Sequence, residues 1–133
     1  LSVEEYRRFV APYSRSVFRT VARTEVPTIH FGTGTAPFLE DFAGAGGEVI
    51  GVDWRLPLDA AWSKIGARAI QGNLDPAHLF LPLKPLKAAV REVLRQAAGR
   101  RGHVFNLGHG ILPETPVAHA RAVVDWVHEL TAR

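Results

Sequence analysis

The chain has 133 residues, of which 47% are hydrophobic and 22% are charged. This composition excludes a disordered chain, and the length is sufficient for one hydrophobic core but not for two. No apolar run approaches the roughly 20 residues of a membrane span, and no segment resembles a signal peptide, so we expect neither a membrane protein nor a secreted one. The sequence contains no cysteine, which excludes disulfides, thiolate metal sites and a cysteine nucleophile and fits a cytoplasmic protein. It also contains no methionine, so we do not expect Leu1 to be the first residue of the gene product.

The formal net charge is +3, from 16 Lys and Arg against 13 Asp and Glu. The densest group of cations is Lys84, Lys87, Arg91 and Arg95. Their spacing is helical, and the opposite stripe of the same helix is apolar, so these cations are interpreted as the solvated face of an amphipathic helix. We therefore expect a mildly basic surface and no nucleic-acid partner, although an anionic ligand remains compatible with the charge.

Residues 3–24 show apolar positions three and four apart, which predicts two helical pieces with Pro12 at the start of the second. The period then changes. Short apolar runs rich in β-branched and aromatic residues predict four strands, over 28–33, 48–54, 67–74 and 103–107. The segments between and after them predict four helices, over 36–43, 58–65, 86–98 and 116–131.

Capping signals support these helix boundaries. Thr35 precedes the first of the four helices, Gly66 and Gly99 follow the next two, and Thr115-Pro116 has the pattern of an N-cap followed by the first helical residue. The alternation of strands and helices predicts an α/β fold, a parallel sheet covered by helices. Four such units form either a small open sheet or half of an eight-stranded barrel.

In both architectures, ligands bind where strands end and helices begin. Four segments occupy this position in the sequence: Gly32–Thr35, Asp53–Arg55, Asn73–Pro76 and Leu107–Gly110. Asp53 and Asp75 are candidate ligand groups there, although Asp75, which precedes Pro76, is interpreted as a helix cap.

Three common site types are disfavoured. Gly32 and Gly34 form a G-x-G pattern after a strand, with Asp53 downstream, as in dinucleotide-binding loops. Pro37, however, stands where such a loop needs a small residue. A plain strand-to-helix turn is therefore the preferred interpretation. No histidine pair has the spacing of zinc ligands, so no metal is expected. No G-x-S-x-G motif is present, which disfavours a serine nucleophile.

His109 is the best candidate for a binding residue. It stands between Gly108 and Gly110 directly after an apolar strand. Flanking glycines allow close backbone approach and leave the imidazole unshielded, so that it can donate to a carboxylate or phosphate. A surface histidine in a turn, without a ligand, is the alternative.

The segment Phe105–Pro116, FNLGHGILPETP, closely resembles the last strand and loop of the uroporphyrinogen decarboxylase family. The segments 1–6, Pro12-Tyr13, 51–55 and 71–76 are similar to earlier parts of the same family, in the same order. The resemblance thus covers nearly the whole chain.

The resemblance implies that residues 1–133 are the C-terminal half of a single (β/α)8 TIM barrel, with four parallel strands and outer helices, the N-terminal half being absent. It implies a lyase that removes the carboxyl groups of the four acetate side chains of uroporphyrinogen to give coproporphyrinogen, in porphyrin and haem biosynthesis. Such enzymes use no metal and no organic cofactor, and act as cytoplasmic homodimers.

By the same resemblance, the arginines, aspartate, tyrosine and serine or threonine that the family uses on its substrate precede Leu1. The family's loop histidine corresponds to His109, which is expected to bind a substrate carboxylate, with Gly108 and Gly110 as its supporting loop and no catalytic residue within the chain. The isolated chain should therefore be inactive. Related cobalamin-dependent methyltransferases bind zinc through His and Cys and are excluded because cysteine is lacking. A non-catalytic half-barrel that serves in binding or assembly is the remaining alternative.

Overall fold

A computed structural model of the chain describes residues 1–132. It begins with two helices, α1 (Val3–Phe9) and α2 (Ala11–Val21), which end in a short 3-10 turn, η1 (Ala22–Thr24). The expected break is confirmed: α2 begins at Ala11, one residue before Pro12, because proline is tolerated in the first turn, where its missing N–H has no intrahelical partner. Ser2 and Glu5 form a capping box at the start of α1.

The four expected strands are present and form one parallel sheet in the order β1-β2-β3-β4. They are β1 (Ile29–Phe31), β2 (Val49–Gly51), β3 (Ala69–Leu74) and β4 (His103–Leu107). The last strand has the bounds expected from the sequence, whereas β1, β2 and β3 are shorter than expected. Because the order in the sheet follows the order in the chain, each strand is joined to its neighbour by a helical crossover.

The crossovers place 3-10 turns before two of the helices. β1 leads into η2 (Ala36–Phe38) and α3 (Leu39–Gly44), where one helix over 36–43 was expected. β2 leads into α4 (Leu58–Lys64), β3 into η3 (Pro76–Phe80) and α5 (Leu83–Ala97), and β4 into α6 (Val117–Thr131). Helix α5 begins three residues earlier than expected, because Pro85 occupies its first turn and costs no intrahelical hydrogen bond there.

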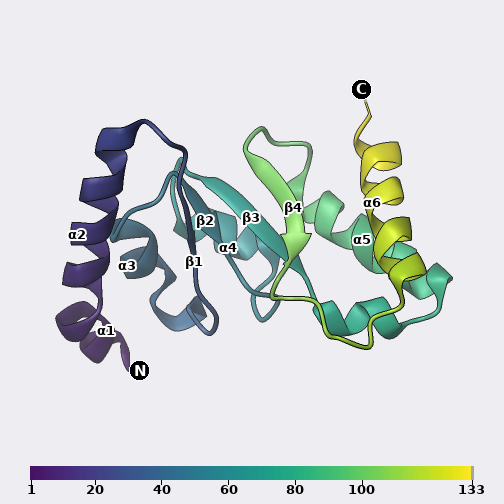
Figure 1. Cartoon of the computed structure of the whole chain (residues 1–133), viewed down its shortest axis with the longest axis horizontal. Helices are drawn as coiled ribbons and strands as arrows, with labels where there is room; N and C mark the ends of the chain where they lie inside the picture. The colour runs from purple at the N-terminus through teal and green to yellow at the C-terminus, as the bar shows by residue number, and fades with distance from the viewer. Residues whose placement is uncertain (133) are drawn as a thin grey trace.

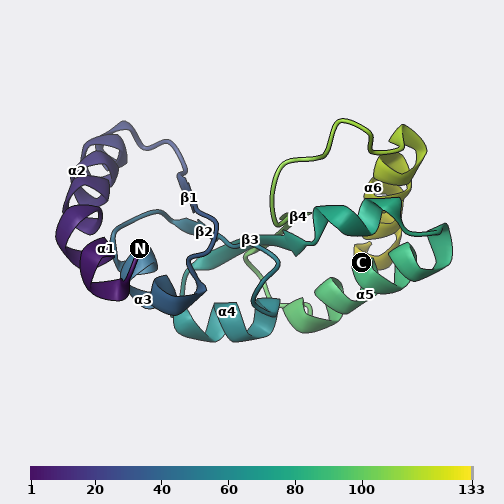
Figure 2. The same ribbon diagram turned by 90° about the horizontal axis from the view of Figure 1, so that it is seen from below.

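Helices α3, α4 and α5 lie along one face of the sheet, while α1 and α2 stand at the β1 end and α6 at the β4 end (Figures 1 and 2). The core lies between this face and the helices, where Ile50, Ile70, Leu58 and Leu86 are fully buried. On α5 the expected division is confirmed for most positions. Leu86, Val90, Val93 and Ala97 are buried, whereas Lys84, Arg91 and Arg95 are exposed. Lys87 departs from it, because its side chain is 24% exposed, lies over the Trp126 ring of α6 and pairs with Glu129 at 3.1 Å instead of facing solvent.

The other face of the sheet carries no helix within residues 1–132 (Figure 2). Strand register places Phe31, Gly51, Gln71 and Val104 in one row across it. Phe31 and Val104 are 45% and 43% exposed, and Ile29 in β1 is 49% exposed. This face is therefore partly apolar and open.

One capping prediction is wrong. Pro116, not Thr115, is the N-cap of α6, and Val117 is its first residue. The Thr115 hydroxyl is buried and has no hydrogen-bond partner among residues 1–132. Thr35 stands at the N-cap of η2, but its side chain makes no capping hydrogen bond. No helix in this part of the chain is long and apolar enough to cross a membrane.

Candidate active site at the carboxyl edge of the sheet

The loops that follow the four strands meet at one edge, because parallel strands end on the same side of a sheet. Hydrogen bonds join them to one another. The Asp53 carboxylate, after β2, accepts from the backbone N–H of Gly34, after β1, at 2.6 Å. The Asn73 amide, at the end of β3, donates to the carbonyls of Asp53 and Leu56 at 2.9 and 2.7 Å. The N–H of Gly108, after β4, donates to the Leu74 carbonyl at 2.7 Å.

Asp53 is the centre of this arrangement and is not itself open to a ligand. Its side chain is 3% exposed. Besides Gly34, it accepts from the backbone N–H of Arg55 at 3.0 Å and from the Arg55 guanidinium at 2.7 Å. A buried carboxylate needs such partners. The prediction that Asp53 is a ligand group is therefore wrong. Its carboxylate instead joins the loop after β1 to the loop after β2.

The G-x-G segment is a strand-to-helix turn, as preferred. Gly34 has φ +67, a left-handed conformation that favours glycine. A Cβ on Gly32 would lie 2.9 Å from the Thr35 Cγ2 atom. The acidic residue downstream, Asp53, is bound to this same turn. The pattern that suggests a dinucleotide loop thus has an internal structural explanation.

In the loop after β2, Trp54 is half-buried and Arg55 is exposed. The Arg55 guanidinium lies over the Trp54 ring, with its central carbon 4.2 Å from the ring centroid. One side of the guanidinium is held by Asp53, and the Arg55 side chain is 52% exposed. A stacked and hydrogen-bonded arginine of this kind is held in one orientation while it keeps free donors.

His109 lies at the same edge. Its imidazole is exposed and stands edge-on to two aromatic rings, Phe31 and Trp54, each with ring centroids 6.4 Å away. Phe31 comes from β1 and Trp54 from the loop after β2, so His109 reaches across the sheet from the end of β4. The structure therefore brings His109, Trp54 and Arg55 together on one platform.

The two glycines beside His109 differ in their surroundings. Gly108 is buried, and a Cβ there would lie 2.5 Å from the backbone nitrogen of Trp54. Gly110 is exposed, and nothing lies within 4 Å of a Cβ built on it. The backbone at Gly108 is thus closely approached, as expected, but by the Trp54 backbone and not by a ligand.

Asp75 is a cap, as interpreted. Its carboxylate accepts from the Ala77 N–H at 2.9 Å at the start of η3.

The remaining histidines are dispersed. Three of them have a ring nitrogen within hydrogen-bond distance of a backbone carbonyl: His30 with Gly46 at 3.1 Å, His103 with Gly72 at 2.9 Å and His119 with Leu79 at 2.8 Å. No group of three or more metal-ligating side chains is found among residues 1–132.

Sequence reasoning singled out His109 but gave no role to Trp54, Arg55 or Phe31. The signal for the first two was present, because Asp53-Trp54-Arg55 directly follows a strand and places a large aromatic and a cation at the ligand-binding edge. Phe31 had no such signal. Its position in an apolar strand does not distinguish a core residue from one on the open face.

Four parallel strands, helices on one face, and an imidazole and a guanidinium at the carboxyl edge define an α/β protein consistent with part of a TIM barrel. The family described as uroporphyrinogen decarboxylase matches residues 1–130. The chain belongs to this family.

Individual relatives agree with this assignment. The chain is 54% identical over 130 residues to the uroporphyrinogen decarboxylase of Solibacter usitatus, covering 97% of this chain and 38% of that protein. It is 53% identical over 131 residues to that of Sorangium cellulosum, covering 98% and 38%. It is 46% identical over 132 residues to that of Thermus thermophilus, covering 99% and 39%. The chain therefore spans somewhat more than a third of the length of these relatives.

Proposed function

We propose that the protein of which this chain is part removes the carboxyl groups of the four acetate side chains of uroporphyrinogen, giving coproporphyrinogen without metal or organic cofactor. The observation that carries the proposal is the placement of His109, an exposed imidazole at the carboxyl edge of the sheet in a chain that belongs to this family. This is the edge at which parallel α/β sheets and barrels bind their ligands.

The chemistry of the substrate fits this edge. Uroporphyrinogen carries eight carboxylates, so its site must present hydrogen-bond donors and cations. His109 and Arg55 supply such groups, and Trp54 with Phe31 supplies aromatic surface beside them. In each step the bond between an acetate methylene and its carboxyl carbon breaks, carbon dioxide leaves, and a proton converts the methylene to a methyl group. Protonation of the pyrrole supplies the electron sink.

His109 has a binding role in this scheme. It donates a hydrogen bond to a substrate carboxylate and so orients the macrocycle over the edge of the sheet. The charge that develops on the pyrrole must be stabilised by an anion. Asp53 is not that anion, since its carboxylate is buried and engaged by Gly34 and Arg55. That group is expected in the part of the protein outside this chain.

The same proposal includes the architecture and the assembly. Residues 1–133 would form the C-terminal half of a (β/α)8 barrel, with the open face of the sheet turned toward the barrel interior. The open row of Phe31, Gly51, Gln71 and Val104 supports this arrangement, because side chains on that face fill the interior of a closed barrel. A cytoplasmic homodimer is proposed from the family resemblance.

The test is an assay of the full-length protein. Purified protein containing this chain should convert uroporphyrinogen to coproporphyrinogen in the presence of a strong chelator, whereas a polypeptide of residues 1–133 alone should not exceed background. Loss of activity on chelation would contradict the cofactor-independent reaction. Full-length protein that does not turn over the substrate would favour a non-catalytic binding or assembly module instead.

A further inference from the structure

We infer that Arg55 is a second carboxylate-binding residue of this site, which shares the Trp54 ring as a neighbour with His109. The inference rests on the proposed function and adds to it a second residue that binds a carboxylate of the substrate.

The first argument is that the Arg55 guanidinium is held in a fixed position. Its Nη1 atom donates to the Asp53 carboxylate at 2.7 Å, and its plane lies over the Trp54 ring at 4.2 Å. Asp53 is in turn anchored by the Gly34 N–H. Arginine loses much conformational freedom when it binds an anion, and a side chain already held loses less. The geometry is therefore that of a prepared binding group.

The second argument is that donors remain free. A guanidinium has five N–H groups, and the only side-chain hydrogen bond of Arg55 within residues 1–132 goes to Asp53. The Arg55 side chain is 52% exposed. Arginine matches a carboxylate with two parallel N–H donors, so the exposed side of this guanidinium suits a carboxylate of the substrate.

The third argument is that Asp53 does not depend on Arg55 alone. Its carboxylate also accepts from two backbone N–H groups, those of Gly34 and Arg55 itself. These bonds survive replacement of the side chain. Replacement of the guanidinium therefore leaves Asp53 with two hydrogen-bond donors, so the loop can keep its structure in an Arg55 variant.

The fourth argument is position. Arg55 lies over the face of the Trp54 ring, and the His109 ring stands nearly perpendicular to Trp54 with the two ring centroids 6.4 Å apart. The two donors thus border one aromatic surface. A macrocycle with carboxylates around its rim presents anions at several points, and two donors beside one aromatic platform can bind two of them.

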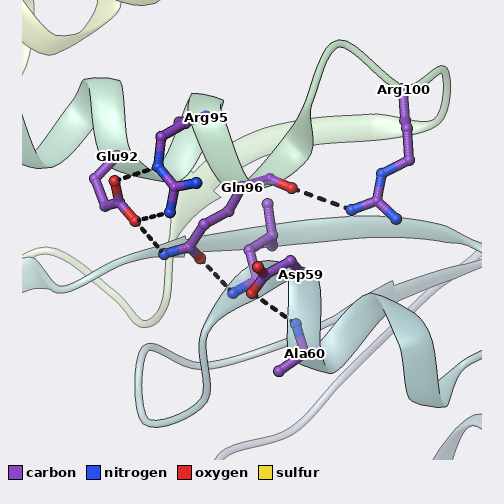
Figure 3. A network of polar contacts seen from close by, with 7 residues as sticks. Asp59, Ala60, Glu92, Arg95, Gln96 and Arg100 are labelled. Carbon is purple, nitrogen blue, oxygen red and sulfur yellow. Dashed lines mark hydrogen bonds and ion pairs between the residues drawn. The ribbon is translucent and has the colours of Figure 1, made fainter.

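The test compares Arg55→Gln with Arg100→Gln in the full-length protein. Arg100 is a matched control because its guanidinium also lies over a tryptophan ring, that of Trp62, at 4.1 Å. It lies before β4, at the opposite edge of the sheet, and donates to the backbone carbonyl of Gln96 (Figure 3) and to that of Ala97. The two variants remove the same charge from the same kind of stack.

Binding of uroporphyrin, the stable octacarboxylate, is measured by fluorescence at several salt concentrations, together with KM and kcat for uroporphyrinogen. Arg55→Gln should raise Kd and KM about tenfold, the effect of one charge-assisted hydrogen bond, with little change in kcat. The difference should shrink as salt rises. Arg100→Gln should change Kd and KM less than about twofold. Arg55→Lys, which keeps the charge, should recover part of the affinity.

The outcomes separate the two proposals. If the wild type binds and turns over the substrate but Arg55→Gln matches Arg100→Gln, the role of Arg55 is wrong and the proposed function stands. If Arg55→Gln lowers kcat and thermal stability while Kd and its salt dependence stay at wild-type values, Arg55 only supports the Asp53 loop, and the inference is overturned. If the wild type neither binds nor converts the porphyrin, the proposed function fails and the inference fails with it.

Discussion

The side-chain oxygen of Gln96 accepts a hydrogen bond from the backbone N–H of Leu58 at 2.7 Å. Leu58 is the first residue of α4, and its N-cap, Pro57, has no side chain that can cap the helix. Gln96 lies in α5, so one helix caps the start of another. The Gln96 amide is oriented by its donation to Glu92 at 2.9 Å, and Arg95 holds the pKa of Glu92 at about 2, so this acceptor is ionised. The loop of Trp54 and Arg55 is thereby fixed at its far end.

Replacement of Gln96 by alanine should lower the free energy of unfolding. The Leu58 N–H would lose its acceptor at a helix start, which costs about 1–2 kcal/mol. Arg91→Ala is the matched control, because Arg91 is an exposed residue of the same helix, and it should change stability by less than about 0.5 kcal/mol. Urea unfolding of the full-length variants measures both values. Equal stability of the two variants would show that the cap contributes nothing.

Gly108 and Gly110 provide a test of backbone approach. Gly108→Ala would place a Cβ 2.5 Å from the Trp54 nitrogen, a backbone atom that cannot move without displacing its loop. We expect a destabilisation of about 1–3 kcal/mol and a weaker site, because Trp54 and His109 shift together. Gly110→Ala meets no atom within 4 Å and should be neutral. Thermal unfolding and kcat/KM of the two variants distinguish them, and a harmless Gly108→Ala would contradict the close contact.

The sequence predicts the sheet well because strand signals are local. His103–Leu107 has the expected bounds, and the apolar stripe of α5 is buried as expected. What it did not predict depends on contacts between distant segments. The cap on Leu58 comes from Gln96, 38 positions away, and the use of the Asp53 carboxylate by Gly34 requires the two strand ends to be adjacent. Thr115 shows the opposite error, since its local signal is that of a cap but the helix begins after Pro116.

For the site, the sequence identifies the edge and one of its residues. His109 stands out because of its flanking glycines, and the structure places it at the expected edge. Arg55 has only a weak signal, its place after a strand beside Trp54, which does not separate it from the other arginines of a basic surface. Only the stack on Trp54 and the bond to Asp53 distinguish it.

Stability should fall on mild acidification because of two histidines. Burial lowers the pKa of both His30 and His103 below the usual 6.5, although carbonyl contacts, to Gly46 and Phe42 for His30 and to Gly72 for His103, oppose the shift. The unfolded chain therefore binds protons that the folded chain does not, once pH falls below about 6.5. Stability is fully present above pH 6.5 and is lost as pH falls through that value toward the folded pKa values.

Unfolding of the full-length protein between pH 8 and pH 5 tests this prediction. The free energy of unfolding should decrease below about pH 6.5. His30→Gln should flatten part of the pH dependence, because it removes one of the two buried imidazoles. A wild-type stability that rises on acidification would contradict the sign of the effect.

A polypeptide of only these 133 residues should associate in solution. The strands β1 and β4 are the edges of the sheet within the described residues, and Ile29, Phe31 and Val104 are exposed on its open face. Unpaired strand edges and exposed apolar patches promote association. Sedimentation velocity at micromolar concentration should show oligomers or aggregates. A compact monomer with cooperative unfolding would overturn this expectation.

His109→Ala in the full-length protein tests the binding role directly. A charge-assisted hydrogen bond to a carboxylate contributes about 1.5–3 kcal/mol, so kcat/KM should fall roughly 10- to 150-fold. Residual activity should remain, because a donor that orients the substrate is not the group that stabilises the pyrrole charge. His128→Ala is the control, since its exposed ring has no hydrogen-bond partner within residues 1–132, and it should leave kcat/KM unchanged. Wild-type kinetics for His109→Ala would show that His109 is a surface histidine in a turn without a binding role. A loss of kcat/KM beyond about 10⁴-fold would mean that the imidazole transfers a proton.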